Sequence, residues 1–215
     1  MKKILCIALA LLMILSLCAC GKKSAEEEEG PNAVGTLPIP FDDPNNLQEA
    51  MIPAEFKADG LKMAEDGTYT LDADIYVQVM YDAVDVSRMK KGDRFFDADG
   101  NEMTVRSIKS EDSLLLVNGG LDEGGVTLFS VGGGVYMQVN EDGFVAVFNT
   151  GAATYPVSPD FTLVDNADPG NPDVTVPLAE LADYLAADTI GFTPNNTTLE
   201  IADAQITGVT RNCVP

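Results

Sequence analysis

Apolar side chains recur at every second position from Leu71 to Ala83, in a segment that begins at Thr68. Acidic residues and glutamine fill most of the positions between the apolar ones, so one face of this segment is apolar and the other is polar. The apolar positions are Leu71, Ala73, Ile75, Val77, Val79, Tyr81 and Ala83. This period of two predicts a β-strand with one buried face. Because strands usually run about 5–6 residues, we expect a bend or bulge partway along it.

Strands and tight turns follow each other through the middle of the chain. Asp99-Gly100 and Asp142-Gly143 predict hairpin turns, because glycine readily adopts the positive φ of such turns. The glycine clusters between 119 and 134 also predict turns or bulges, since a phosphate-binding loop would need a nearby lysine and none follows Lys109. Leu114–Asn118 predicts a further strand. From Val86 to Ile108, the order of strand, Lys-x-Gly-Asp turn and Asp-Gly hairpin resembles the small-barrel pattern of many extracellular bacterial domains.

The C-terminal part contains the one strong helical pattern. Residues 177–187 begin with proline and repeat leucine and alanine at helical spacing. The segment before it, 155–177, is rich in turn residues and predicts a loop with one strand at 161–164. Thr198–Ile201 and Ile206–Thr210 predict a closing pair of strands.

These patterns together predict an α+β fold that is mainly β. We expect an antiparallel barrel or a sandwich-like sheet with one short helix in the C-terminal half. Leu47–Met51, which lies just before Pro53, predicts an additional short helical turn.

The N-terminus has the composition of a secretory signal. Lys2 and Lys3 precede an apolar run from Ile4 to Leu17, which is fourteen residues long. A membrane-spanning helix needs about 20 apolar residues, so this run fits a cleaved signal peptide better than a permanent membrane span.

Leu17-Cys18-Ala19-Cys20, followed by Gly21, resembles the lipobox of bacterial lipoproteins. The resemblance implies that signal peptidase II cuts after Ala19 and that Cys20 carries a diacylglyceryl group and further fatty acid such as palmitate. It therefore implies an extracytoplasmic protein held at the bacterial cell membrane through the lipid on Cys20. Two long acyl chains are enough for stable anchoring, because burial stabilises by about 0.8 kcal/mol per CH₂. The alternative is an ordinary secretory signal that releases a soluble protein.

The predicted organisation follows from this cleavage site. Residues 1–19 form the signal peptide, and 20–40 form an acylated, flexible tether that includes the acidic run at 26–29. Residues 41–215 form the β-rich domain, with a possible division into 65–150 and a smaller unit at 155–215.

The charge of the chain restricts its partners. The formal net charge is −21, and 30 acidic but only 9 basic residues lie within 41–215. Nucleic acid is therefore not expected as a partner, because no cluster of basic residues can displace phosphate counterions. An anionic bilayer would also be repelled, so we expect the lipid rather than the protein surface to hold the membrane. A protein or glycan partner is left open.

The sequence lacks the side chains that most catalytic and metal sites use. It contains no histidine, which excludes Ser-His-Asp and Cys-His arrangements and His-containing zinc sites. Cleavage removes Cys6 and Cys18 and acylation uses Cys20, so only Cys213 is left, and we expect it to be half-buried in a terminal strand. No catalytic, cofactor-binding or metal-binding residue is nominated.

Three functions are therefore open. The expected one is a non-catalytic binding or interaction module at the envelope surface. The first alternative is a carboxylate-dependent hydrolase of envelope or extracellular glycans, which needs two acids about 5–9 Å apart. The second is a calcium-binding surface protein, for which Asp97–Glu102 and the acids Asp165, Asp168 and Asp173 are candidates, although Gly100 stands at position four of that first loop rather than six.

Overall fold

The computed structural model describes residues 32–35 and 43–214. The predicted signal peptide, Cys20 and most of the tether lie outside these residues. In the described part, strands predominate and one helix is longer than two turns, so the prediction of an α+β, mainly β fold is confirmed.

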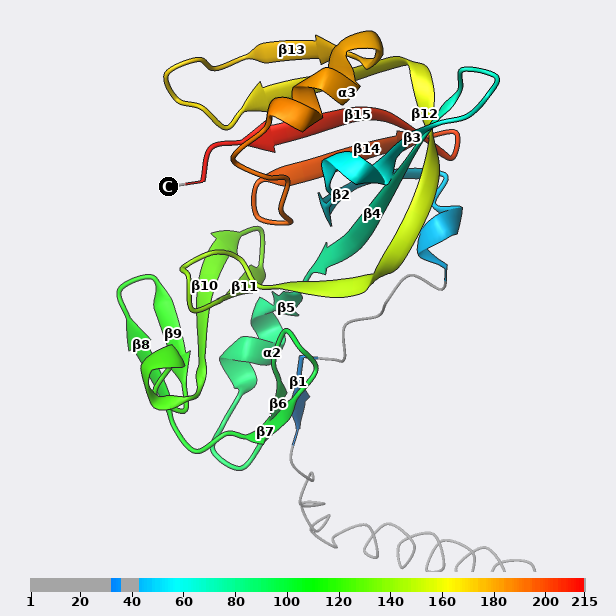
Figure 1. The fold of residues 1–215 in the computed structure, drawn as a ribbon. Helices are drawn as coiled ribbons and strands as arrows, with labels where there is room; N and C mark the ends of the chain where they lie inside the picture. Colours follow the sequence, from blue (N-terminus) through cyan, green and yellow to red (C-terminus); the bar gives the residue numbers. More distant parts are fainter. Residues whose placement is uncertain (1–31, 36–42, 215) are drawn as a thin grey trace, which may run out of the picture. The chain divides into compact units, whose positions relative to one another are not determined.

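The largest sheet closes into a five-stranded barrel (Figure 1). Its strand order is β13-β12-β15-β14-β2-β4-β3, and an additional pairing of β12 with β4 completes the ring of β12, β15, β14, β2 and β4. These strands span Glu49–Glu55 (β2), Leu61–Met63 (β3), Tyr69–Gln78 (β4), Val147–Asn166 (β12), Val174–Pro177 (β13), Thr197–Ala202 (β14) and Gln205–Asn212 (β15). Of the two predicted architectures, the barrel is therefore correct, although it is not antiparallel throughout, because β12 and β15 pair in parallel.

Strand β12 makes the closure possible because it is long enough to change partners. Its first half pairs antiparallel with β4 as far as Val157. Val157 also pairs with β15, and from Thr162 onward the second half pairs with both β15 and β13. The prediction of a loop at 155–177 was therefore wrong for 155–160, 165–166 and 174–177, whereas the strand predicted at 161–164 is confirmed as part of β12. Pro156 and Pro159 suggested a loop, but they lie where the strand exchanges partners and the hydrogen-bond ladder is interrupted, so missing N–H groups are tolerated there.

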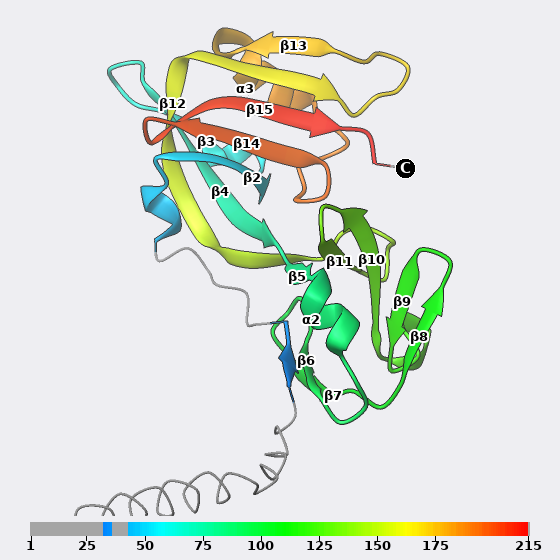
Figure 2. The same cartoon turned by 180° about the vertical axis from the view of Figure 1, so that it is seen from behind.

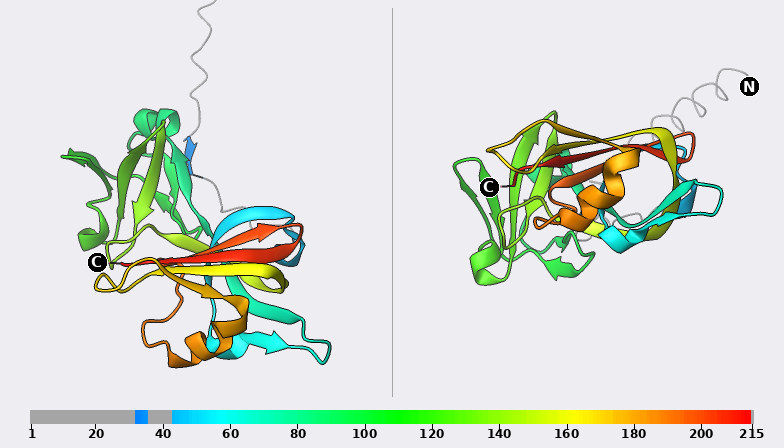
Figure 3. Two further views of the ribbon diagram at one scale, coloured as in Figure 1. Left: turned by 90° about the horizontal axis from the view of Figure 1, so that it is seen from above. Right: turned by 45° about the horizontal axis from the view of Figure 1, so that its top comes forward.

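The barrel interior is filled by apolar side chains, and helix α3 (Leu178–Ala187) lies across its opening (Figure 3). Leu181 and Leu185 of this helix are buried in the same hydrophobic cluster as the inward side chains of the strands. The predicted helix and its core-facing leucines are confirmed.

The residues before β2 correct one prediction. The helical turn lies at Pro44–Asn46 (η2), and most of the predicted turn at 47–51 belongs to β2 instead. Asp43 accepts a hydrogen bond from the Asn45 N–H, which starts the turn at the proline. The Tyr155 hydroxyl accepts from the Leu47 N–H at 2.8 Å and fixes the segment against β12. Another 3₁₀ turn, η3 (Ala58–Gly60), connects β2 to β3.

A second group of strands surrounds its own hydrophobic cluster (Figure 2). A five-stranded sheet has the order β5-β11-β10-β9-β8, and a three-stranded sheet has the order β1-β6-β7. These elements span Ala33–Val34 (β1), Met80–Asp82 (β5), Arg94–Phe96 (β6), Glu102–Thr104 (β7), Ile108–Glu111 (β8), Leu114–Val117 (β9), Val126–Gly132 (β10) and Val135–Val139 (β11). Two short helices, α2 (Ala83–Arg88) and η4 (Leu121–Glu123), connect them.

The long alternating segment is interrupted as expected, because β4 ends at Gln78 and β5 begins at Met80. Helix α2 follows directly and was not predicted; its N-terminus is capped by the Asp82 carboxylate, which accepts from the Val84 N–H at 2.7 Å. The Asp99-Gly100 hairpin between β6 and β7 is confirmed, with φ of 80° at Gly100.

Two further predictions need correction. The predicted tether includes Ala33–Val34, but these residues pair in parallel with β6 and Val34 is buried in the second cluster. Burial of the Val34 side chain in this core stabilises the pairing, whereas Ala33 stays exposed. Cys213 is exposed rather than half-buried, because β15 ends one residue before it.

Candidate functional site

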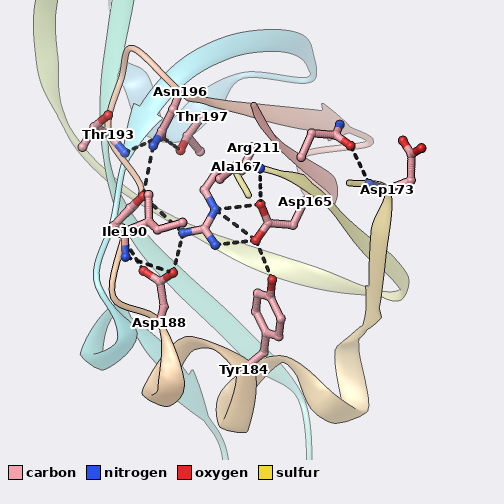
Figure 4. A network of polar contacts seen from close by, with 12 residues as sticks. Asp165, Ala167, Asp173, Tyr184, Asp188, Ile190, Thr193, Asn196, Thr197 and Arg211 are labelled. Atoms are coloured by element: carbon pink, nitrogen blue, oxygen red, sulfur yellow. Dashed lines mark hydrogen bonds and ion pairs between the residues drawn. The ribbon is translucent and has the colours of Figure 1, made fainter. Parts of the chain in front are cut away.

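Arg211, on strand β15, is the centre of a buried polar network in the barrel (Figure 4). Its side chain is only 3% exposed. The Nε atom donates to Asp165 at 3.0 Å, and the Nη2 atom also contacts this carboxylate. The Nη1 atom donates to Asp188 at 2.6 Å and to the Gly191 carbonyl at 3.2 Å. The guanidinium therefore has partners on β12, at the end of α3 and in the following loop.

Asp165 is held ionised by its surroundings. Burial alone would raise the pKa of this carboxyl, but hydrogen bonds from Arg211, the Tyr184 hydroxyl at 2.6 Å and the Ala167 N–H at 2.9 Å outweigh that effect and lower the pKa. Burial likewise opposes the charge of Arg211, yet the two aspartates raise its pKa. Burial and the negative charge of Asp165 raise the pKa of Tyr184, so its hydroxyl keeps its proton and acts as a donor.

The network also orders the loop that follows α3. Asp188 accepts from the Gly191 N–H at 2.7 Å, and the Arg211 guanidinium lies 4.0 Å from the centre of the Phe192 ring. Asn196 accepts from the Thr193 N–H at 2.8 Å and donates to the Gly191 carbonyl at 3.1 Å. Together with the contact of Arg211 with Asp165, the network joins side chains that lie up to 46 residues apart in the sequence.

A cavity of about 200 Å³ adjoins the network and is lined in part by Asp168, Asn171 and Ile190. Both carboxylates that line it are already occupied by Arg211, and the lowered pKa of Asp165 keeps this carboxyl ionised near neutral pH, so it has no proton to donate. The arrangement is suited to holding β12, β15 and α3 together rather than to proton transfer.

The structure separates the acids that the sequence suggested as calcium ligands. Asp165 is engaged with Arg211, whereas Asp168 accepts from the Gly170 N–H at 2.8 Å. In the other candidate loop, Asp97 accepts from the N–H groups of Asp99 and Asn101, so its oxygens already serve the hairpin turn. Within residues 32–35 and 43–214, no three potential metal-binding side chains come together.

The second candidate site is a face of the five-stranded sheet. Cross-strand pairing aligns Met80 of β5, Met137 of β11, Phe129 of β10 and Leu114 of β9 in one row. Directly paired residues point to the same side of a sheet, so these four side chains share a face. We call these four residues the outer face. Val131 is not included, because it lies at the β-bulge between Ser130 and Gly132, where the alternation is interrupted.

The opposite face of the sheet packs into the second hydrophobic cluster. Leu128, Val117 and Val126 are buried in the second hydrophobic cluster, and Leu115 and Tyr136 pack against it. No outer-face residue belongs to that cluster or packs against it. Met80 remains 62% exposed and Leu114 39% exposed. Met137 and Phe129, between them, are partly buried. The outer face is therefore an apolar row whose two ends are exposed.

Sequence reasoning missed both candidate sites. The outer face did leave a signal, because Val126–Val131 and Val135–Val139 carry apolar residues on both sides of the strand rather than on one. The Arg211 network left none, since its members come from distant parts of the chain. Cys20, the predicted site of lipidation, lies outside the described residues.

Comparison with known proteins adds no relative. No family model, curated protein or solved structure matches this chain. None of the helices within 32–35 and 43–214 has the length and apolar character that crossing a bilayer requires.

Proposed function

We propose that this protein is a lipid-anchored, extracytoplasmic bacterial protein whose β-rich domain is a non-catalytic binding module. The lipobox Leu17-Cys18-Ala19-Cys20 supports the anchor, and Cys20 would carry the acyl chains. The observation that carries the binding role is the outer face of the five-stranded sheet, on which a protein partner would dock.

An exposed row of this kind is unusual on a domain with so many charges. Met80 and Leu114 are exposed at its two ends, and the partly buried Met137 and Phe129 lie between them, so the four apolar side chains are adjacent rather than scattered. Contiguous apolar patches on soluble domains mark interaction sites, whereas single exposed apolar residues carry no such meaning. Methionine suits a binding surface, because its flexible side chain adapts to partners of different shape.

The binding role is also favoured over glycan hydrolysis. A hydrolase needs a carboxyl whose pKa is raised, so that it can donate a proton. The aspartates with clear shifts are Asp66, Asp72 and Asp165, and hydrogen bonds lower the pKa of each of them.

The anchor is tested by replacing Cys20, the residue proposed to carry the lipid. Cys20→Ser should abolish labelling by radioactive palmitate and move the protein from the membrane fraction to the soluble fraction. Cys213→Ser is the matched control and should keep both properties, because it changes the exposed C-terminal thiol alone. Labelling of the Cys20→Ser variant, or its retention in membranes, would show that the anchor is wrong.

The docking role is tested in intact cells with a photo-crosslinking amino acid. Placed at Met137 on the outer face, it should give an adduct with another protein. Placed at Met51, which is 74% exposed on the barrel strand β2, it should give none. If neither position forms an adduct, the outer face is not a docking surface.

A further inference from the structure

We infer that the outer face binds a polypeptide segment that is both apolar and basic. This inference rests on the proposed binding function and names the chemistry of the partner. The geometry of the row, the charges on the same side of the sheet and the charge of the whole chain support it.

The row defines the apolar part of the partner. It crosses four adjacent strands from Met80 to Leu114, and at about 4.8 Å between strands it is roughly 14 Å long. An amphipathic helix of about ten residues has the same length, since each residue adds 1.5 Å. Such a helix would place two or three turns of apolar side chains on the row.

Acidic side chains border the row at both ends. Asp82 lies two residues beyond Met80 on β5, and Glu111 is paired with Leu114 on the edge strand β8, so both are on the side of the outer face. Lys109 is the basic residue on this side of β8, and it already forms an ion pair with Glu111. The negative charge of Glu123 acts on Lys109 as well. The border therefore has an excess of negative charge that a basic segment would neutralise.

The overall charge distinguishes a basic partner from a second copy. Each chain carries a formal net charge of −21, so two copies would repel each other as their outer faces approached. A basic partner would be attracted over the same distance. Charge complementarity therefore favours a cationic segment over a second copy of this chain. The test below distinguishes the two.

The inference is tested with the full acylated chain in nanodiscs of zwitterionic phosphatidylcholine, with empty nanodiscs as the background. Three peptides of equal length serve as probes: one of lysine and leucine in an amphipathic helical pattern, one with glutamate in place of lysine, and one with serine in place of leucine. We expect saturable binding of the lysine–leucine peptide alone. Raising the salt concentration from about 0.05 to about 0.5 M should weaken that binding, because the border charges are exposed.

Paired substitutions locate the site. Met80→Ser with Leu114→Ser should lower the affinity for the lysine–leucine peptide at least about tenfold. Met51→Ser with Met63→Ser is the matched control, because these methionines are 74% and 66% exposed on β2 and β3, away from the outer face. The control should bind like the parent, and equal thermal midpoints for the two variants would show that both are folded.

Each other outcome overturns the inference. Equal binding of the glutamate–leucine or the lysine–serine peptide would show that charge or apolar contact is not required. Equal binding by the two double variants would place the site elsewhere. A crosslinked dimer from the probe at Met137 would make a second copy the partner. If the probe captures a protein in cells while no peptide binds, only the partner chemistry is wrong; if it captures nothing, the proposed function fails.

Discussion

The barrel and the five-stranded sheet cover their apolar side chains in different ways. Each has apolar side chains on both sides of at least one strand, but the barrel curls around one side and covers its opening with α3. The five-stranded sheet stays open, so one side packs against the second cluster and the other is only partly covered, with Met80 and Leu114 exposed. Closure removes the edges of five strands, whereas an open sheet keeps both edges and a second face.

The barrel and the five-stranded sheet also differ in which side chains they bury and which they expose. In the barrel, Arg211 is taken out of water together with two carboxylates, and the bonds it makes are internal. Throughout the described part of the chain, each fully buried side-chain nitrogen or oxygen has a hydrogen-bond partner. On the five-stranded sheet, Met80 and Leu114 are exposed on the outer face. The barrel therefore has the features of a stability element, and the sheet is the region for which we propose an interaction.

The largest effect is expected when the buried ion pair of the barrel is broken. Asp165→Asn should lower the free energy of unfolding by about 3–5 kcal/mol, because it leaves Arg211 buried with one carboxylate fewer. Urea denaturation of the two proteins measures this difference. A loss under about 1 kcal/mol would show that the network does not hold the barrel together.

Adjacent residues on β10 sharpen the comparison within one strand. Leu128→Ala removes a fully buried side chain from the inner face and should cost about 2–5 kcal/mol. Phe129→Ser, on the outer face, should cost about 1 kcal/mol or less, because that side chain is only partly covered. Thermal unfolding of both variants distinguishes them, and equal losses would mean that the outer face is covered in the folded chain.

A smaller effect is expected from pH. Because the folded state lowers the pKa of Asp165, its ion pair stabilises the protein above the ordinary aspartate pKa of about 3.9. That contribution should disappear as pH falls below about 4 and through the lowered pKa. The urea midpoint of the parent should therefore fall more steeply with acid than that of Asp165→Asn. Parallel curves would show that Asp165 is not the acid-sensitive group.

The smallest effect is expected at the surface of the barrel. Lys62 and Asp72 form an ion pair between β3 and β4, with side chains 62% and 39% exposed. Lys62→Ala should change the free energy of unfolding by about 0–1 kcal/mol, because solvent and salt screen such pairs. A loss as large as that of Asp165→Asn would contradict the contrast between buried and exposed pairs.

Much of the fold could be predicted from local patterns. The strands at Leu114–Val117 and Thr197–Ala202, the helix α3 and the Asp99-Gly100 hairpin were all expected, because each depends on residues close together in the chain. The exchange of partners by β12 was not expected, since Pro156 and Pro159 have the local character of a loop. Helix α2 was missed because six residues carry too little periodicity.

The sequence by itself determined the local choices: alternation for strands, and glycine and aspartate for turns. The proposal of an anchor at Cys20 also rests on the sequence, through the resemblance of residues 17–20 to a lipobox. Only the tertiary structure decided which strands meet, and therefore which apolar residues are buried. Arg211 finds Asp165 across 46 residues, and Met80 joins Leu114 through two intervening strands. Both arrangements depend on strand pairing over long distances in the chain, which hydrophobic periodicity does not specify.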